Sequence, residues 1–147
     1  MATRATIIST VTTALRDDFP KDNVVNRFKT VDDLINEPGN LNKFPWLNVT
    51  LASHGGDLSL DGSQQDLVVI PIAIFAFTIA KVKGIDLQID VAALIDSIVA
   101  SLTTVPHTNA YCAAGFGITS YSATPAEDEQ HHDVGVAFVV AEFVTGD

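Results

Sequence analysis

The stretch with the densest chemistry in this chain is "EDEQHHD", which runs from Glu127 to Asp133 and contains two adjacent histidines. Imidazole and carboxylate groups bind metal ions and transfer protons, so His131, His132 and Asp133 form a candidate metal or acid-base site. Zinc sites commonly use spacings such as HExxH or CxxC, and neither spacing occurs here. Adjacent residues of an extended backbone also point to opposite sides, which suits a shared metal ion poorly.

We therefore interpret this stretch as an exposed turn before the last strand, with a small metal-dependent enzyme as the alternative. Its acidic residues, Glu127 and Asp128 among them, would discourage pairing of a strand edge with another chain. Histidines titrate near neutral pH, so a contact made through His131 and His132 would depend on pH.

Other candidate groups are isolated in the sequence. His54 lies in a separate glycine-rich loop, and Asp57, Asp61 and Asp66 lack the spacing and the closing glutamate of an EF-hand. Cys112 is the single cysteine, which excludes an internal disulfide and CxxC zinc sites. Neither GxSxG nor a phosphate-binding GK[ST] loop occurs. We expect no catalytic residue, no metal and no cofactor, and hence a protein that is not an enzyme.

Composition favours a protein that assembles. Apolar residues make up 47% of the 147 residues, more than one small core needs, and an oligomer would bury the excess. The net charge of −10 and the scattered Lys and Arg residues argue against phosphate-mediated binding of nucleic acid, although DNA could slide past such a surface. The N-terminus is too polar for a signal peptide, and the longest apolar run is too short to cross a bilayer. We expect a soluble protein made in a cytoplasm, without membrane contact.

The first third of the chain predicts two helical pieces and a strand. An apolar stripe predicts a helix from about Thr6 to Arg16, and the segment "NVVNRFK" is expected to be extended. Thr30 is a plausible N-cap with Asp33 three residues on, which predicts a small helix before "EPG". "FPWLNVTLAS" alternates in hydropathy, so we expect a half-buried strand there.

The run from Leu67 to Ala80 is apolar on both faces, because Ile72 and Phe75 fall on opposite sides of an extended backbone. Helices of the same chain can cover one face, and the other face then needs a second layer, most simply a neighbouring subunit. Pro71 lacks an N–H group, which predicts an edge position or a bulge near it.

The remaining elements are a helix and two strands. The apolar stripe of "IDLQIDVAALIDSIVASL" predicts an amphipathic helix. Its Asp90, Ser97 and Ser101 are expected to face solvent. "AYCAAGFGITSYSA" and "VGVAFVVAEFV" read as strands, and small residues on one face of the last strand allow close approach of another layer. The order predicts one α+β domain over residues 1–147, with an antiparallel sheet and helices on one face. Its N-terminal helical part covers about 1–43, and the sheet and long helix cover about 44–147.

This pattern of elements resembles the tail-terminator (tail-completion) proteins of tailed bacteriophages. The resemblance covers roughly Phe44 to Thr145 and is carried by "PWLNVTL", "VVIPIAIFAFTIA", the helix "QIDVAALIDSIVASL" and the final "VGVAFVVAEFV". It rests on element order, length and strand character, and no short motif anchors it. Functional residues of the family are therefore not carried over to this chain.

The resemblance implies a homo-hexameric ring in the virion, assembled in the host cytoplasm. Such a ring ends the tail tube, docks on a neck or connector protein, possibly also meets a sheath, and lets DNA pass through its lumen without sequence-specific binding. The long glycine-rich loop from Ser53 to Asp66 is also typical of neck adaptor or stopper proteins, so a head-tail joining protein is the alternative. A binding module that holds a partner without forming a ring differs from the ring subunit only in stoichiometry.

The candidate contact residues come from the two-faced strand and from two polar loops, 53–66 and 122–133. They are Ile72, Phe75, Phe77, His54, Asp57, Asp61, Glu127, Asp128, His131 and His132.

Overall fold

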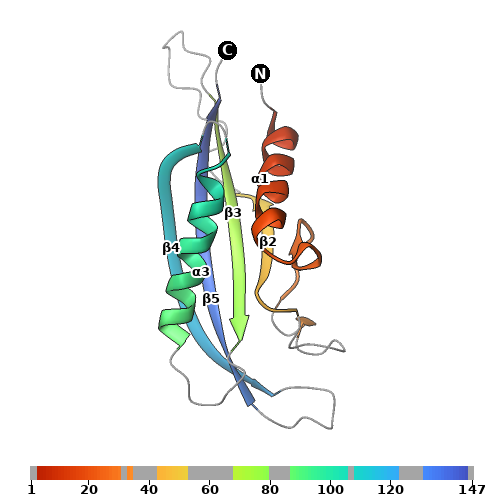
Figure 1. Ribbon diagram of the computed structural model, residues 1–147, viewed down its shortest axis with the longest axis vertical. Helices are drawn as coiled ribbons and strands as arrows, with labels where there is room; N and C mark the ends of the chain where they lie inside the picture. Colours follow the sequence, from red (N-terminus) through yellow and green to blue (C-terminus); the bar gives the residue numbers. More distant parts are fainter. Residues whose placement is uncertain are drawn as a thin grey trace.

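The chain forms an α+β domain in which two helices cover one face of a five-stranded sheet, as the computed structural model shows (Figure 1). The structure describes residues 3–30, 33–34, 43–52, 68–79, 87–105, 108–122 and 131–145. The elements in chain order are α1 (Arg4–Asp18), a 3-10 turn (Lys21–Asn23), β1 (Val24–Val25), β2 (Trp46–Leu51), β3 (Val68–Ile79), α3 (Leu87–Leu102), β4 (Thr108–Ser122) and β5 (His131–Thr145). The α+β class with helices on one face is therefore confirmed.

The strand order of the sheet is β1-β2-β3-β5-β4. The pairs β2–β3, β3–β5 and β4–β5 are antiparallel, as expected for this part of the sheet. The short β1 runs parallel to β2, with Val24 opposite Leu47 and Val25 opposite Asn48. The sheet is therefore mixed at this edge, where two residues of "NVVNRFK" pair parallel to β2.

Helix α1 is longer than the sequence stripe indicates, because its ends are fixed by capping. Thr3 precedes the helix and its Oγ1 accepts a hydrogen bond from the Thr6 N–H at 3.1 Å, as an N-cap residue does. The Phe19 N–H closes the other end on the Leu15 carbonyl at 2.9 Å, and Pro20 follows. The apolar side of α1 packs on the sheet through Val11 and Leu15, both fully buried.

The chain after β1 contains the capping box that the sequence predicts. The Asp33 N–H donates to Thr30 Oγ1, and the Thr30 N–H donates to Asp33 Oδ2, each at 3.2 Å. Asp33 and Leu34 are helical, and Leu34 is fully buried. The rest of the expected small helix lies outside the described residues.

Helix α3 buries the stripe that the sequence predicts, with Val91, Ile98 and Leu102 at most 1% exposed. Ser101 was expected to face solvent, and this expectation is wrong. Its side chain is buried, and its hydroxyl is hydrogen-bonded to the Asp18 carboxylate and to the Ser97 carbonyl. The hydroxyl therefore links the last turn of α3 to the end of α1, which gives a polar residue a satisfied place inside the helix layer.

Strand β2 shows the expected alternation, but it is buried on both faces along most of its length. Leu47 and Val49 lie under the helices. Trp46 and Asn48 are covered on the other face by described residues of two segments: Val25, Lys29, Leu34 and Phe44. The prediction of a half-buried strand is wrong for Trp46 to Val49, because two chain segments wrap around this end of the sheet.

Strand β3 is two-faced as predicted and is paired on both sides, so its expected edge position is wrong. Pro71 is tolerated because it lies level with the end of β2. The Pro71 carbonyl accepts from the Ala52 N–H at 3.0 Å, one residue beyond the last residue of β2. Its missing N–H would face the same side, so only the return bond from residue 71 to the end of β2 is lost. The β3–β5 register runs through Pro71 without a shift, so no bulge is needed.

Small residues on β5 allow α3 to approach the sheet closely, as the sequence predicts. Gly135 lies opposite Thr78 of β3, and both face the first turns of α3. A β-carbon at Gly135 would lie 2.5 Å from Val91 Cγ2 and 3.0 Å from Thr78 Cγ2. The helix can rest at this height only because position 135 carries no side chain.

Replacement of this glycine is expected to destabilise the domain. Gly135→Ala should lower the free energy of unfolding by about 1–3 kcal/mol, because α3 must shift or Val91 must leave its rotamer. Chemical denaturation followed by circular dichroism measures this loss. Val91→Ala removes the clashing methyl groups, so the double variant should be more stable than the sum of the two single losses implies. Strict additivity of the two losses would contradict the close contact.

Candidate protein–protein interface

The face of the sheet opposite the helices carries an apolar surface, which we call the open face. It is formed by alternate residues of β3 and β5 that stand opposite each other in the register: Ala73 and Val140, Phe75 and Phe138, and Phe77 and Val136. Phe75, Val136, Phe138 and Val140 are half-buried, although they occupy the two central strands of the domain. Apolar side chains in the middle of a sheet are normally covered by a second layer.

One end of this face is already covered by the chain itself. Leu34 and Phe44 pack there with Trp46, Phe77 and Ile79 in a second, smaller hydrophobic cluster. Phe77 is only 5% exposed as a result. The open face is thus reduced to the part around Phe75, Phe138 and Val140.

A row of three phenylalanines crosses this part of the sheet. Phe28, from the segment after β1, packs edge-on against Phe75 with ring centroids 5.5 Å apart and an interplanar angle of 82°. Phe75 in turn contacts Phe138 at 4.5 Å. Phe28 remains 48% exposed, so the row ends in an accessible aromatic ring. Exposed aromatic rings next to half-buried apolar residues are typical of protein contact surfaces.

The segment that carries Phe28 is held on the sheet by a buried asparagine. Asn48 is fully buried, and its Oδ1 accepts from the Lys29 N–H at 2.9 Å and from Trp46 Nε1 at 3.1 Å. Its amide nitrogen donates to the Lys29 carbonyl at 3.1 Å and to the Phe75 carbonyl at 3.5 Å. The side chain therefore binds both backbone groups of Lys29, as a neighbouring strand would.

A second asparagine, Asn26, binds the same segment to α1 and to β2. Asn26 Nδ2 donates to the Val49 carbonyl at 3.1 Å and to Thr12 Oγ1 of α1 at 2.9 Å. The segment from Asn26 to Thr30 thus has side-chain bonds to both the helix layer and the sheet. Sequence reasoning missed this role of Asn26 and Asn48. An amide residue flanked by apolar residues in a strand, as in "WLNVTL", is the signal that could have indicated it.

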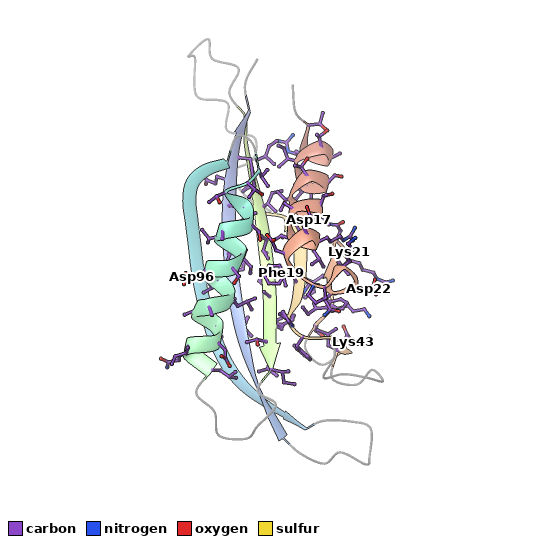
Figure 2. The ribbon with its side chains drawn as sticks, viewed as in Figure 1. Asp17, Phe19, Lys21, Asp22, Lys43 and Asp96 are labelled. Atoms are coloured by element: carbon purple, nitrogen blue, oxygen red, sulfur yellow. The ribbon has the colours of Figure 1, made fainter. Side chains whose placement is uncertain are left out.

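Charged groups lie around the open face rather than within it. Lys29 Nζ lies 5.5 Å from the centre of the Trp46 ring, and Glu142 stands opposite Pro71 at the far end of the face. In Figure 2, Asp17, Lys21, Asp22 and Lys43 lie on the flank of the molecule beside α1, and Asp96 points away from α3 on the opposite flank. Asp17 and Asp96 belong to the helix layer, whereas Lys29 and Glu142 lie toward the two ends of the open face. An apolar centre with charged groups at its margin is the arrangement expected of a contact between proteins.

The structure separates the three predicted contact residues of β3. Ile72 lies under the helices and is fully buried in the main core, so it forms no surface in this chain. Phe77 lies on the same face as Phe75 but is buried beneath the chain's own segments, so of the three residues only Phe75 is accessible there. Alternation of faces along the strand explains the difference between Ile72 and Phe75.

The predicted residues of the two polar loops are only partly described. His54, Asp57, Asp61, Glu127 and Asp128 lie outside the described residues. The backbones of His131 and His132 belong to β5, where they stand opposite Ser122 and Tyr121 of β4.

The boundary of the expected turn is therefore wrong at its C-terminal end. Asp133 also belongs to β5 and stands opposite Ser120, so the hairpin strands continue through the "HHD" triplet. The side chains that the structure describes contain no group of three His, Cys, Asp or Glu residues that could hold a metal ion. What the described residues do form is the open face around Phe75, Phe138 and Val140, which suits apolar contact with another chain.

Comparison with models of known protein families finds no match for this chain. Comparison with curated protein sequences finds no match either. None of the helices in the described ranges has the length and apolar character needed to cross a membrane.

Proposed function

We propose that this chain is a structural subunit that assembles with copies of itself and ends the tail tube of a bacteriophage as a ring. The observation that supports self-assembly best is the open face. Its half-buried Phe75, Phe138 and Val140 lie on the two central strands, opposite the helix layer. Burial of such a surface against another chain stabilises a complex by roughly 25 cal/mol per Å² of apolar area removed from water.

The place of the ring in a phage tail rests on the resemblance in element order described above. The order α1, β2, β3, α3, β4, β5 agrees with that pattern. The net charge of −10 suits a lumen through which DNA slides without adhering, because like charges keep the phosphates away from the wall. Tube and neck proteins are the partners that this role requires.

Self-assembly is tested by measuring the mass of the chain in solution. Light scattering coupled to size exclusion, across a wide concentration range, should give a multiple of the 15.6 kDa chain, with a hexamer for the complete ring. Negative-stain images of the same sample should then show rings. A monomer at all concentrations, which persists when a tail-tube protein is added, would contradict the proposal.

A charge on the open face should prevent assembly while the fold survives. Val140→Asp places a carboxylate on the half-buried, helix-free side of β5, where an assembled complex would bury it without a partner. We expect the assembly to become at least tenfold weaker. The protein concentration at which half of the chains are dissociated should therefore rise at least tenfold.

The matched control places the same charge on the other layer. Ala93 is exposed on α3, so Ala93→Asp adds a carboxylate that stays in water. This variant should keep the mass of the wild-type chain. Equal behaviour of Val140→Asp and Ala93→Asp would show that the open face takes no part in assembly.

A further inference from the structure

Helix α3 carries a second apolar stripe besides the one that it buries in the core. Its residues are spaced i, i+3, i+4 and i+7, so they line one side of the helix, which we call the α3 flank: Ala92, Ile95, Asp96 and Val99. Ile95 and Val99 are half-buried, and Ala92 and Asp96 are exposed. The outer side of a surface helix is normally polar, whereas Asp96 is the only charged residue of this stripe.

The α3 flank points away from α1. Ser101 marks the side of α3 that meets α1, because its hydroxyl donates a hydrogen bond to the Asp18 carboxylate. Ser97 shares this side, and Val99 lies about 200° around the helix from Ser97, at about 100° per residue. Figure 1 shows α3 near β4 and α1 near β2, on opposite sides of the molecule, and Asp96 points outward from the α3 side in Figure 2. The α3 flank and the segment that carries Phe28 therefore lie on opposite sides of the domain.

The open face and the α3 flank also differ in charge. All Lys and Arg residues in the described ranges precede β2 in the sequence. Among them, Lys29 lies over Trp46 at one end of the open face, and Lys43 adjoins Phe44, which covers the same end. Helix α3 contains no Lys or Arg, so the charge of its flank is the carboxylate of Asp96. The two surfaces are therefore both apolar and complementary in charge.

We propose that the α3 flank of one copy packs on the open face of the next copy, with Asp96 facing Lys29. The two surfaces differ, so each copy offers its open face to one neighbour and its α3 flank to the other. In a closed ring of this kind all copies point the same way and the two faces of the ring are unlike, as a ring between a tube and a neck requires. The inference rests on the proposed self-assembly and names the surface that covers the open face.

The direction of the α3 flank agrees with closure into a small ring. The open face points along the line from α3 through the sheet, and the buried stripe of α3 points the same way, through Leu87, Val91, Leu94 and Ile98. At about 100° per residue, the centre of the α3 flank lies about 120° around the helix from the centre of this stripe. In a ring of six, the directions from one copy to its two neighbours also differ by about 120°. Contacts on two exactly opposite faces would instead extend without closing.

Arginine at two adjacent alanines tests the contact. Ala92 and Ala93 are both exposed on α3, but only Ala92 belongs to the α3 flank. Ala92→Arg would place a long cation between the flank and the open face, so the protein concentration at which half of the chains are dissociated should rise at least tenfold. Ala93→Arg is the matched control and should leave this concentration unchanged. Light scattering measures the concentration, and both variants should keep the melting temperature of the wild-type chain.

Exchange of the two facing charges tests where the α3 flank docks. Asp96→Lys and Lys29→Glu should each weaken assembly, because like charges then face each other. The double variant restores opposite charges and should assemble more tightly than either single variant. Asp90→Lys makes the same change of net charge at another exposed position of α3, outside the flank, and should leave assembly unchanged.

The outcomes separate this inference from the proposed function. Weaker assembly in Ala92→Arg but not in Ala93→Arg, with recovery in the exchanged pair, supports the contact. Unchanged assembly in Ala92→Arg, or no recovery in the exchanged pair, overturns it. Self-assembly through the open face still stands in that case if Val140→Asp dissociates the chains. A wild-type chain that is a monomer at every concentration overturns both.

Discussion

Replacement of Ile72 by aspartate should unfold the domain. Ile72 is fully buried between the sheet and the helices, and its cross-strand partner Ala141 is fully buried as well. An unpaired carboxylate in such a core costs more than about 4 kcal/mol, against a total stability of about 5–15 kcal/mol for most domains. Far-UV circular dichroism and urea denaturation of Ile72→Asp should show no cooperative transition at 25 °C.

The control for this prediction is a change of volume at the same site. Ile72→Val removes one methylene and should cost only about 1 kcal/mol, with the transition retained. Val140→Asp, the same charge on the open face, should also stay folded. A native, cooperative transition in Ile72→Asp would show that the helices do not cover β3 at this position.

The comparison of Ile72 with Phe75 shows what could be predicted from the sequence. Alternation along β3 indicated two apolar faces, and the requirement that both be covered was sound. The sequence could not say which face the helices of the same chain would take, because both faces have similar hydropathy. Ile72 was therefore grouped with Phe75 as a contact residue, although the two lie on opposite sides of the sheet.

Long elements with strong periodicity were predicted well, and residues whose role depends on distant segments were not. The stripe of α3 and the small face of β5 follow from local spacing, and the structure confirms both. Ser101 and Asn48 are polar residues at positions that local spacing assigned to solvent. Each is buried because a segment far away in the sequence supplies its hydrogen bonds: Asp18 for Ser101 and Lys29 for Asn48.

The replacement of Asn48 by leucine tests whether this asparagine holds the Phe28 segment on the sheet. Leucine has a similar size but no hydrogen-bonding group, so the Lys29 N–H, the Lys29 carbonyl and Trp46 Nε1 would each lose a bond. Buried polar groups that lose their partners cost about 1–3 kcal/mol each, and we expect a total loss of about 3 kcal/mol. Urea denaturation measures the loss.

Two local probes report what happens to the segment itself. Trp46 is the only tryptophan in the chain, so a change in its emission reports directly on the site. Amide exchange at Lys29 should become faster, because Asn48 Oδ1 accepts the hydrogen bond of that N–H at 2.9 Å. Release of the segment would also remove Phe28 from Phe75 and enlarge the open face.

Thr50→Val provides the matched control, because Thr50 lies on the same face of β2 and donates one weak bond of 3.4 Å to the Ala73 carbonyl. It should change the stability by less than about 1 kcal/mol and leave exchange at Lys29 unchanged. If Asn48→Leu were no more damaging than Thr50→Val, the segment would be held by the hydrogen bonds of Asn26 and the packing of Phe28 without help from Asn48. A larger loss in Asn48→Leu, with faster exchange at Lys29, would instead show that one buried amide determines how much of the open face is available to a second chain.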